Sequence, residues 1–121
     1  MSKIVQAVNV MIANKEKITD VKQLRIELYF LYDKKYKWSI MRDDDTDDYL
    51  LYFYQTNLSI AELVTASDEP DFEVDLVCYK AREIGTKEAF STFRDLFQIL
   101  KEKVLGVDEV LDDIIGDDVP F

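Results

Sequence analysis

The sequence predicts an α+β protein in which an antiparallel sheet of about four strands packs against helices from both ends of the chain. Short segments of alternating apolar and polar residues are typical of strands with one buried face. Apolar residues that recur every three or four positions near both ends are typical of amphipathic helices. The 121 residues are 48% hydrophobic with 3 Gly and 2 Pro, which predicts a single folded domain over residues 1–121.

The N-terminal part predicts one helix followed by two strands. The helix is expected over about residues 3–14, with Ser2 as its N-cap and its apolar side chains on one stripe. A short turn near residues 19–23 leads to the first strand at residues 25–32. A polar turn separates it from a second strand at residues 36–42, so the two strands form a hairpin.

The middle of the chain completes a three-stranded meander and adds a helix. An acidic loop at residues 43–48 precedes the third strand at residues 49–54. Ser59 and Glu62 have the spacing of a capping box, which predicts a short helix over about residues 60–66.

The C-terminal part predicts a fourth strand and two more helices. Residues 72–80 alternate as a strand with one solvated face. Thr86 is placed to cap the longest helix, about residues 87–104, and Gly106 stands where a helix C-terminal glycine belongs. A short helix over residues 109–115 follows, so the predicted order is α-β-β-β-α-β-α-α. The apolar stripe of the longest helix contains Ala89, Phe90, Phe93, Leu96, Phe97, Leu100 and Val104.

The negative charge is concentrated in two blocks. The net charge is −10, and residues 43–78 and 106–121 carry acidic residues without any Lys or Arg. Because phosphate contacts need a basic surface, duplex nucleic acid and anionic membranes are excluded as expected partners. The chain shows neither a signal peptide at its start nor a long apolar run, and a cytoplasmic location is the expectation.

Several residue types on which enzymes depend are missing. The chain has no histidine, which removes the usual general base and the commonest metal ligand. Cys78 is the only cysteine, so no disulfide can form within the chain, and a nucleophilic role for it is disfavoured. The three glycines are isolated, so no phosphate-binding loop is present. We therefore predict no catalytic residue, no cofactor and no metal site.

The acidic loop is the best candidate for a cation site. Asp43, Asp45 and Asp47 have the alternate-residue spacing of the first ligands in a calcium loop. The match then fails, because Asp48 replaces the glycine of the turn and Tyr54 stands where a bidentate Glu belongs. The favoured interpretation is a solvated hairpin loop.

Tyrosines are concentrated on the predicted strands. Tyr29, Tyr52 and Tyr54 lie opposite the residues expected to face the helices. If nothing covers that second face, it is an exposed aromatic patch of the kind that marks a protein interface. The alternative, a sheet covered on both faces, is equally compatible with the pattern.

The C-terminal residues from Val107 to Phe121 mix acidic and apolar side chains. One interpretation is a final helix that docks on the body of the protein. The other is an acidic, hydrophobic element that docks on a basic partner. Under either interpretation the apolar residues predict that the segment is not a free tail.

Together these features predict a non-catalytic acidic protein that binds a basic protein partner, as inhibitors, immunity proteins and regulatory proteins do. One alternative is a divalent-cation-dependent or carboxylate-based enzyme, using the acidic loop or the strand carboxylates Glu27, Glu73 and Asp75. Another is a structural subunit or homodimer that uses the aromatic sheet face. The candidate partner-binding residues are Asp43, Asp44, Asp45, Asp47, Asp48, Tyr29, Tyr52, Tyr54, Asp112, Asp113, Asp117 and Asp118.

Overall fold

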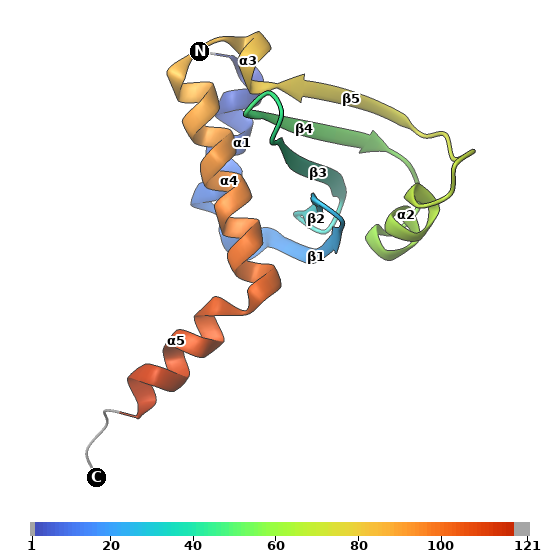
Figure 1. Cartoon of the computed structure of the whole chain (residues 1–121). Helices are drawn as coiled ribbons and strands as arrows, with labels where there is room; N and C mark the ends of the chain where they lie inside the picture. Colours follow the sequence, from blue (N-terminus) through green and yellow to red (C-terminus); the bar gives the residue numbers. More distant parts are fainter. Residues whose placement is uncertain (1, 118–121) are drawn as a thin grey trace.

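The computed structural model describes residues 2–117, and in it the chain builds a five-stranded antiparallel sheet with helices on both faces (Figure 1). The strands are adjacent in chain order: β1 (Ile18–Leu24), β2 (Glu27–Tyr32), β3 (Tyr36–Asp43), β4 (Asp48–Gln55) and β5 (Asp75–Lys80). The helices are α1 (Lys3–Ala13), the 3₁₀ turn η1 (Lys15–Lys17), α2 (Ile60–Ser67), α3 (Ala81–Ile84), α4 (Lys87–Leu105) and α5 (Val107–Gly116). The predicted α+β class with an antiparallel sheet is confirmed, with five strands instead of four.

The additional strand is β1, in a region where the sequence pattern predicted a turn. Its register with β2 shifts between Thr19 and Lys22, and Asp20 has a φ of 53°. This bulge breaks the two-residue alternation by which a half-buried strand is recognised. The segment nevertheless pairs with β2 from Ile18 to Leu24 and forms one edge of the sheet.

The predicted fourth strand is shorter than expected and forms the other edge. β5 begins at Asp75, whereas Phe72 and Val74 belong to a connection that packs beneath α2. The single-turn helix α3 follows β5 directly and was not predicted.

One face of the sheet is covered by α1 and α4 (Figure 1). The predicted stripe of α4 is confirmed, since Phe93, Leu96 and Leu100 are fully buried against the sheet. The predicted caps are also present: Thr86 Oγ1 accepts the Ala89 N–H at 3.0 Å, and Gly106 ends the helix with a φ of 65°. Burial of this apolar stripe is the main force that holds α4 on the sheet.

The opposite face is covered by α2 and the connection that follows it. The predicted capping box is confirmed: Ser59 Oγ accepts the Glu62 N–H at 3.2 Å, and Glu62 Oε1 accepts the Ser59 N–H at 3.0 Å. The hydrogen bond from the Ser59 backbone N–H lowers the pKa of Glu62. The capped helix buries Ile60 and Leu63 and so creates a second, smaller hydrophobic cluster.

Candidate functional site

The acidic loop forms the turn of the β3–β4 hairpin, and neighbouring arginines offset part of its charge. The guanidinium of Arg42 lies 2.7 Å from an oxygen of Asp44 and also pairs with Asp47. Hydrogen bonding to Asp47 raises the pKa of Arg42. Arg82 donates a further hydrogen bond to the carbonyl of Thr46. The loop therefore presents less free charge than its sequence suggests. Its exposed acids are Asp44, Asp45 and Asp47.

Two other aspartates of this region accept hydrogen bonds from backbone N–H groups in or next to the hairpin. Asp43 accepts the backbone N–H of Asp45 at 3.0 Å. Asp48 is only 5% exposed, and its Oδ1 accepts the N–H of Tyr49 at 2.9 Å and that of Arg82 at 3.0 Å. Asp48 is among the residues predicted to bind a partner, and in the structure its carboxylate is buried and anchors the start of α3 to the hairpin.

The alternating aspartates do not converge on a common point. Within residues 2–117, no group of three or more His, Cys, Asp or Glu side chains is placed to hold a metal ion. Asp44 and Asp47 turn toward the guanidinium of Arg42, whereas Asp43 turns toward the backbone of the loop. The arrangement is that of a closed polar turn.

The tyrosine face of the sheet lies largely beneath α2. Tyr29 is 2% exposed and Tyr54 is 6% exposed, with their ring centroids 6.0 Å apart. The expectation of an exposed aromatic patch is therefore wrong for these two residues, and the alternative of a covered face describes them. Tyr52 is partly exposed beside Cys78. Burial raises the pKa of the Cys78 thiol, so this thiol is less reactive than a fully solvent-exposed one.

A polar network joins the buried tyrosines to the sheet. Ser39, which is fully buried, donates a hydrogen bond to Glu27, and its Oγ lies 2.8 Å from the hydroxyl of Tyr54. Tyr54 in turn donates to the same Glu27 oxygen at 3.1 Å. The sequence pattern placed Glu27 on a solvated face, and nothing in the pattern indicates that Ser39 would be buried. Their pairing joins β2 to β3 on the face that α2 covers.

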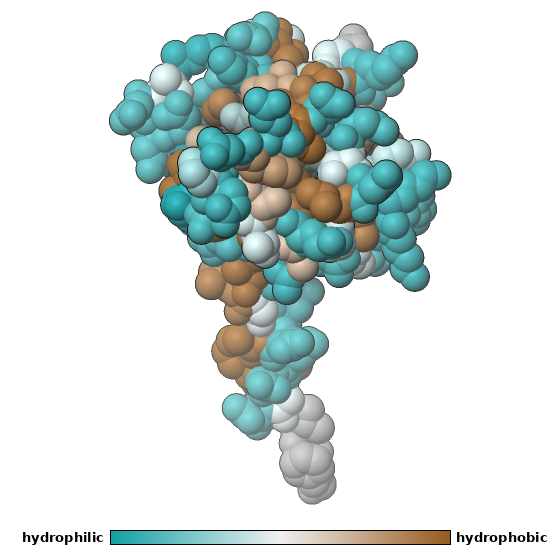
Figure 2. Space-filling model, turned by 90° about the vertical axis from the view of Figure 1, so that its right-hand side faces the viewer, coloured by the Kyte–Doolittle hydropathy of each residue, from teal (hydrophilic) through white to brown (hydrophobic). Residues whose placement is uncertain are grey.

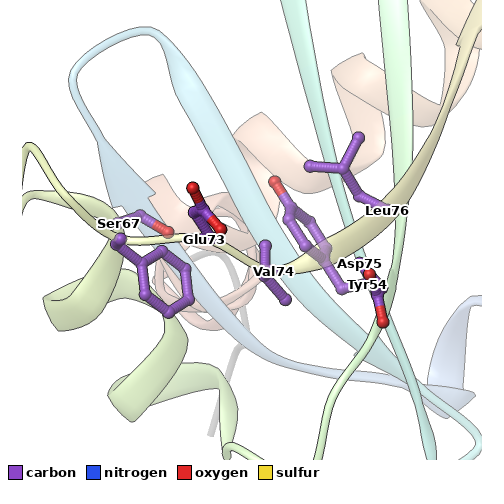
Figure 3. A pocket seen from close by; sticks show the side chains of 7 residues that line it. Tyr54, Ser67, Glu73, Val74, Asp75 and Leu76 are labelled. Carbon is purple, nitrogen blue, oxygen red and sulfur yellow. The ribbon is translucent and has the colours of Figure 1, made fainter.

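An open hollow lies beside this network, between α2 and the segment that leads into β5 (Figure 3). It has a volume of about 690 Å³, and Figure 3 shows Ser67 from α2 and Tyr54 from β4 on the same hollow as residues 73–76. Glu73 and Asp75 contribute two carboxylates to its wall. Ser39 itself is out of reach of solvent. The hydroxyl of Ser67, which lines the hollow, donates a hydrogen bond to the carbonyl of Leu63 at 2.7 Å.

Burial of the tyrosines makes stability sensitive to alkaline pH. Burial raises the pKa of Tyr52 to about 12 and also raises that of Tyr54 above its usual value of 10.0. Between the ordinary pKa of 10.0 and the raised pKa in the folded protein, the phenols of Tyr52 and Tyr54 ionise more readily in the unfolded chain than in the folded one. The contribution to stability is therefore intact below about pH 10 and is lost as the pH rises toward the folded-state pKa.

We expect the urea midpoint of unfolding to fall above about pH 10, and to fall less steeply in Tyr54→Phe. Tyr36→Phe is the matched control, because Tyr36 is 42% exposed and should retain the wild-type decline. Parallel declines in the wild type and Tyr54→Phe would show that Tyr54 does not produce the effect.

The C-terminal helix α5 stands away from the body of the protein (Figure 1). No residue of α5 is buried, although its apolar side chains are large. Figure 2 shows them as a brown surface on the stem below the body. The prediction of a final helix is confirmed, but the interpretation that it docks on the body is wrong. The exposed apolar residues, at 49–67% exposure, are Val110, Leu111, Ile114 and Ile115.

The acids of α5 lie among these apolar residues. Asp112, Asp113 and Asp117 are all exposed, whereas Asp118 lies outside the described residues. Helix α5 has ten residues, no side-chain cap at its start and no base in its last turn. An isolated helix of this length is marginal in water, and acids near its C-terminus oppose its dipole. Contact with another surface would supply the packing that α5 lacks.

No helix among residues 2–117 has both the length and the apolar character needed to cross a membrane. Comparison with protein-family models gives no match, and comparisons with curated proteins and with solved structures give none either.

Proposed function

We propose that this chain is a non-catalytic protein that acts through protein–protein contact, with α5 as its principal contact element. The observation that carries the proposal is the exposure of four large apolar side chains on a helix that stands away from the body. Exposed apolar surface of this kind marks interaction sites, because leaving it in water has a free-energy cost that docking removes.

The charge of α5 indicates what kind of surface would receive it. Four acidic residues lie on α5 and a fifth, Asp117, is its C-cap, whereas α5 carries no base; the four are Asp108, Glu109, Asp112 and Asp113. A complementary partner surface is therefore apolar at its centre and basic at its rim. Charge pairing of this sort speeds association and selects the partner, whereas the apolar contacts slow dissociation. An inhibitor, an immunity protein or a regulatory protein for a basic partner fits this description.

The test is affinity capture from the lysate of the host, carried out in parallel with three forms of the protein. The first is the wild type, the second is Ile114→Ser with Ile115→Ser, and the third is Asp112→Asn with Asp113→Asn. All four substitutions lie at exposed positions, so the body should fold equally well in each form. The captured partner is then purified, and its dissociation constant is measured at low and high salt.

The two variants are expected to fail in different ways. Loss of the apolar pair should raise the dissociation constant by about thirty-fold or more at both salt concentrations. This corresponds to a loss of about 2 kcal/mol of binding free energy. Loss of the two charges should weaken binding at low salt and matter little at high salt, because salt screens exposed charges. Retention of the same proteins by the doubly serine-substituted form would show that α5 is not the contact element.

A further inference from the structure

A second apolar surface lies on the face of the sheet that α1 and α4 cover. Trp38 on β3 lies directly opposite Phe53 on β4, and Phe53 lies opposite Val77 on β5, so the three side chains share this face. Near this row the helices leave the sheet partly bare. Val77 is 49% exposed, and Tyr36 at the start of β3 is 42% exposed. On the helix side, Val10 of α1 is 54% exposed.

All of these residues except Val77 line an aromatic groove between α1 and the sheet. One hollow of about 430 Å³ and another of about 440 Å³ share Ala7, Trp38 and Tyr79. The two hollows follow α1 from Ser2 to Met11, a distance of about 14 Å at the rise of an α-helix. The ten residues of α5 span about 15 Å. The groove is therefore long enough to take one helix of that size.

Trp38, which lines this groove, carries a polar group without a hydrogen-bond partner in the described part of the chain. It lines both hollows, it is 9% exposed, and its indole Nε1 has no hydrogen-bond partner among the described residues. A buried N–H without an acceptor is energetically unfavourable.

The charge around the groove is positive. Lys3 is the one charged residue in its lining, and no acid lines it. In the adjoining β2–β3 turn, Lys34 and Lys35 are exposed beside Asp33, and the Lys35 Nζ lies 5.2 Å from the ring centroid of Tyr36. The chemistry that fits is a short amphipathic helix with large apolar side chains and several carboxylates.

We infer that the aromatic groove receives α5 of a second copy of this chain. Helix α5 has the required length, apolar side chains and acids, and within residues 2–117 it is the one α-helix in which no residue is buried. In Figure 1 it leads away from the body, which presents it to another molecule. The inference rests on the proposed function, since it takes α5 as a contact element and names the surface that it contacts. Reciprocal docking of two copies closes a twofold dimer, in which each chain gives a helix and receives one.

Two single variants test the two sides of this contact. Val10→Glu places a carboxylate in the groove at an exposed position of α1, where it repels the acids of α5. Ile114→Asp removes an apolar anchor from α5 and leaves the groove intact. Ala61→Glu is the matched control, because it adds the same charge at an exposed position of α2 on the opposite face. Circular dichroism checks that every variant keeps the wild-type fold.

The readouts are molar mass by light scattering over a range of concentrations and the fluorescence of Trp38, the only tryptophan in the chain. The wild type and Ala61→Glu should approach twice the mass of one chain as concentration rises, with a shift in Trp38 emission over the same range. Each of the other two variants should associate about tenfold or more weakly.

Two outcomes would overturn the inference. The first is a wild type that stays monomeric with constant Trp38 emission, which would leave the groove to another partner or to none. The second is a Val10→Glu or Ile114→Asp variant that dimerises as the wild type does. The proposed function is judged separately, because α5-dependent capture of another protein would stand even if the chain were monomeric.

Discussion

Leu96→Ala is expected to lower the free energy of unfolding by about 2–5 kcal/mol, since a truncated core leucine loses its transfer energy and leaves a cavity. Leu96 is fully buried on α4, in the cluster that joins this helix to α1 and the sheet. Equilibrium unfolding in urea, followed by circular dichroism, measures the change.

The matched control is Leu111→Ala, the same chemical change on α5. Leu111 is 49% exposed, so this variant should change the free energy of unfolding by about 0.5 kcal/mol or less in the monomer. The comparison must be made at a concentration at which both proteins are monomeric. A loss at Leu111 as large as that at Leu96 would show that α5 packs on the body of its own chain, and the role proposed for α5 would fail.

Asp48→Ala is expected to lower the free energy of unfolding by about 1–3 kcal/mol. The sequence alone suggests a smaller effect, because Asp48 ends an acidic run that is typical of a solvated loop. Its carboxylate accepts the backbone N–H groups of Tyr49 and Arg82. Substitution leaves both donors without this acceptor and frees the start of α3 from the hairpin. Thermal and urea unfolding give the loss in stability.

Asp45→Ala provides the comparison within the same loop. Asp45 is exposed, and its backbone N–H rather than its side chain is hydrogen-bonded by Asp43. Its removal should change stability by about 0.5 kcal/mol or less. Equal effects at the two positions would mean that the loop acts through its total charge and that Asp48 has no separate anchoring role.

Local patterns were sufficient for most of the secondary structure. The period of the apolar residues predicted α4, and the polar turns predicted the β2–β3 and β3–β4 hairpins. The capping box at Ser59 predicted the start of α2, because its two hydrogen bonds form between residues three apart. The strand β1 was missed because its bulge interrupts the alternation that identifies a strand.

The candidate site was predicted less completely, because each of its surfaces depends on residues far apart in sequence. The tyrosines of the sheet were compatible with an open or a covered face, and the packing of α2 decided that Tyr29 and Tyr54 are buried. The sequence identified the acidic loop but not the hydrogen bond that Asp48 accepts from the N–H of Arg82, because α2 and β5 separate these two residues along the chain. The aromatic groove combines α1 with four strands, and no local pattern points to it.

The sequence by itself determined the α+β class, the acidic character and the amphipathic nature of the last helix, because these follow from composition and from neighbours along the chain. Only the tertiary structure decided which apolar faces are covered. The pattern of α5 is equally suited to docking on its own body or on another molecule, since amphipathicity records that a face needs a partner and not which one. The structure leaves α5 uncovered and also leaves Trp38 in an open groove, because burial is settled by contacts between distant segments.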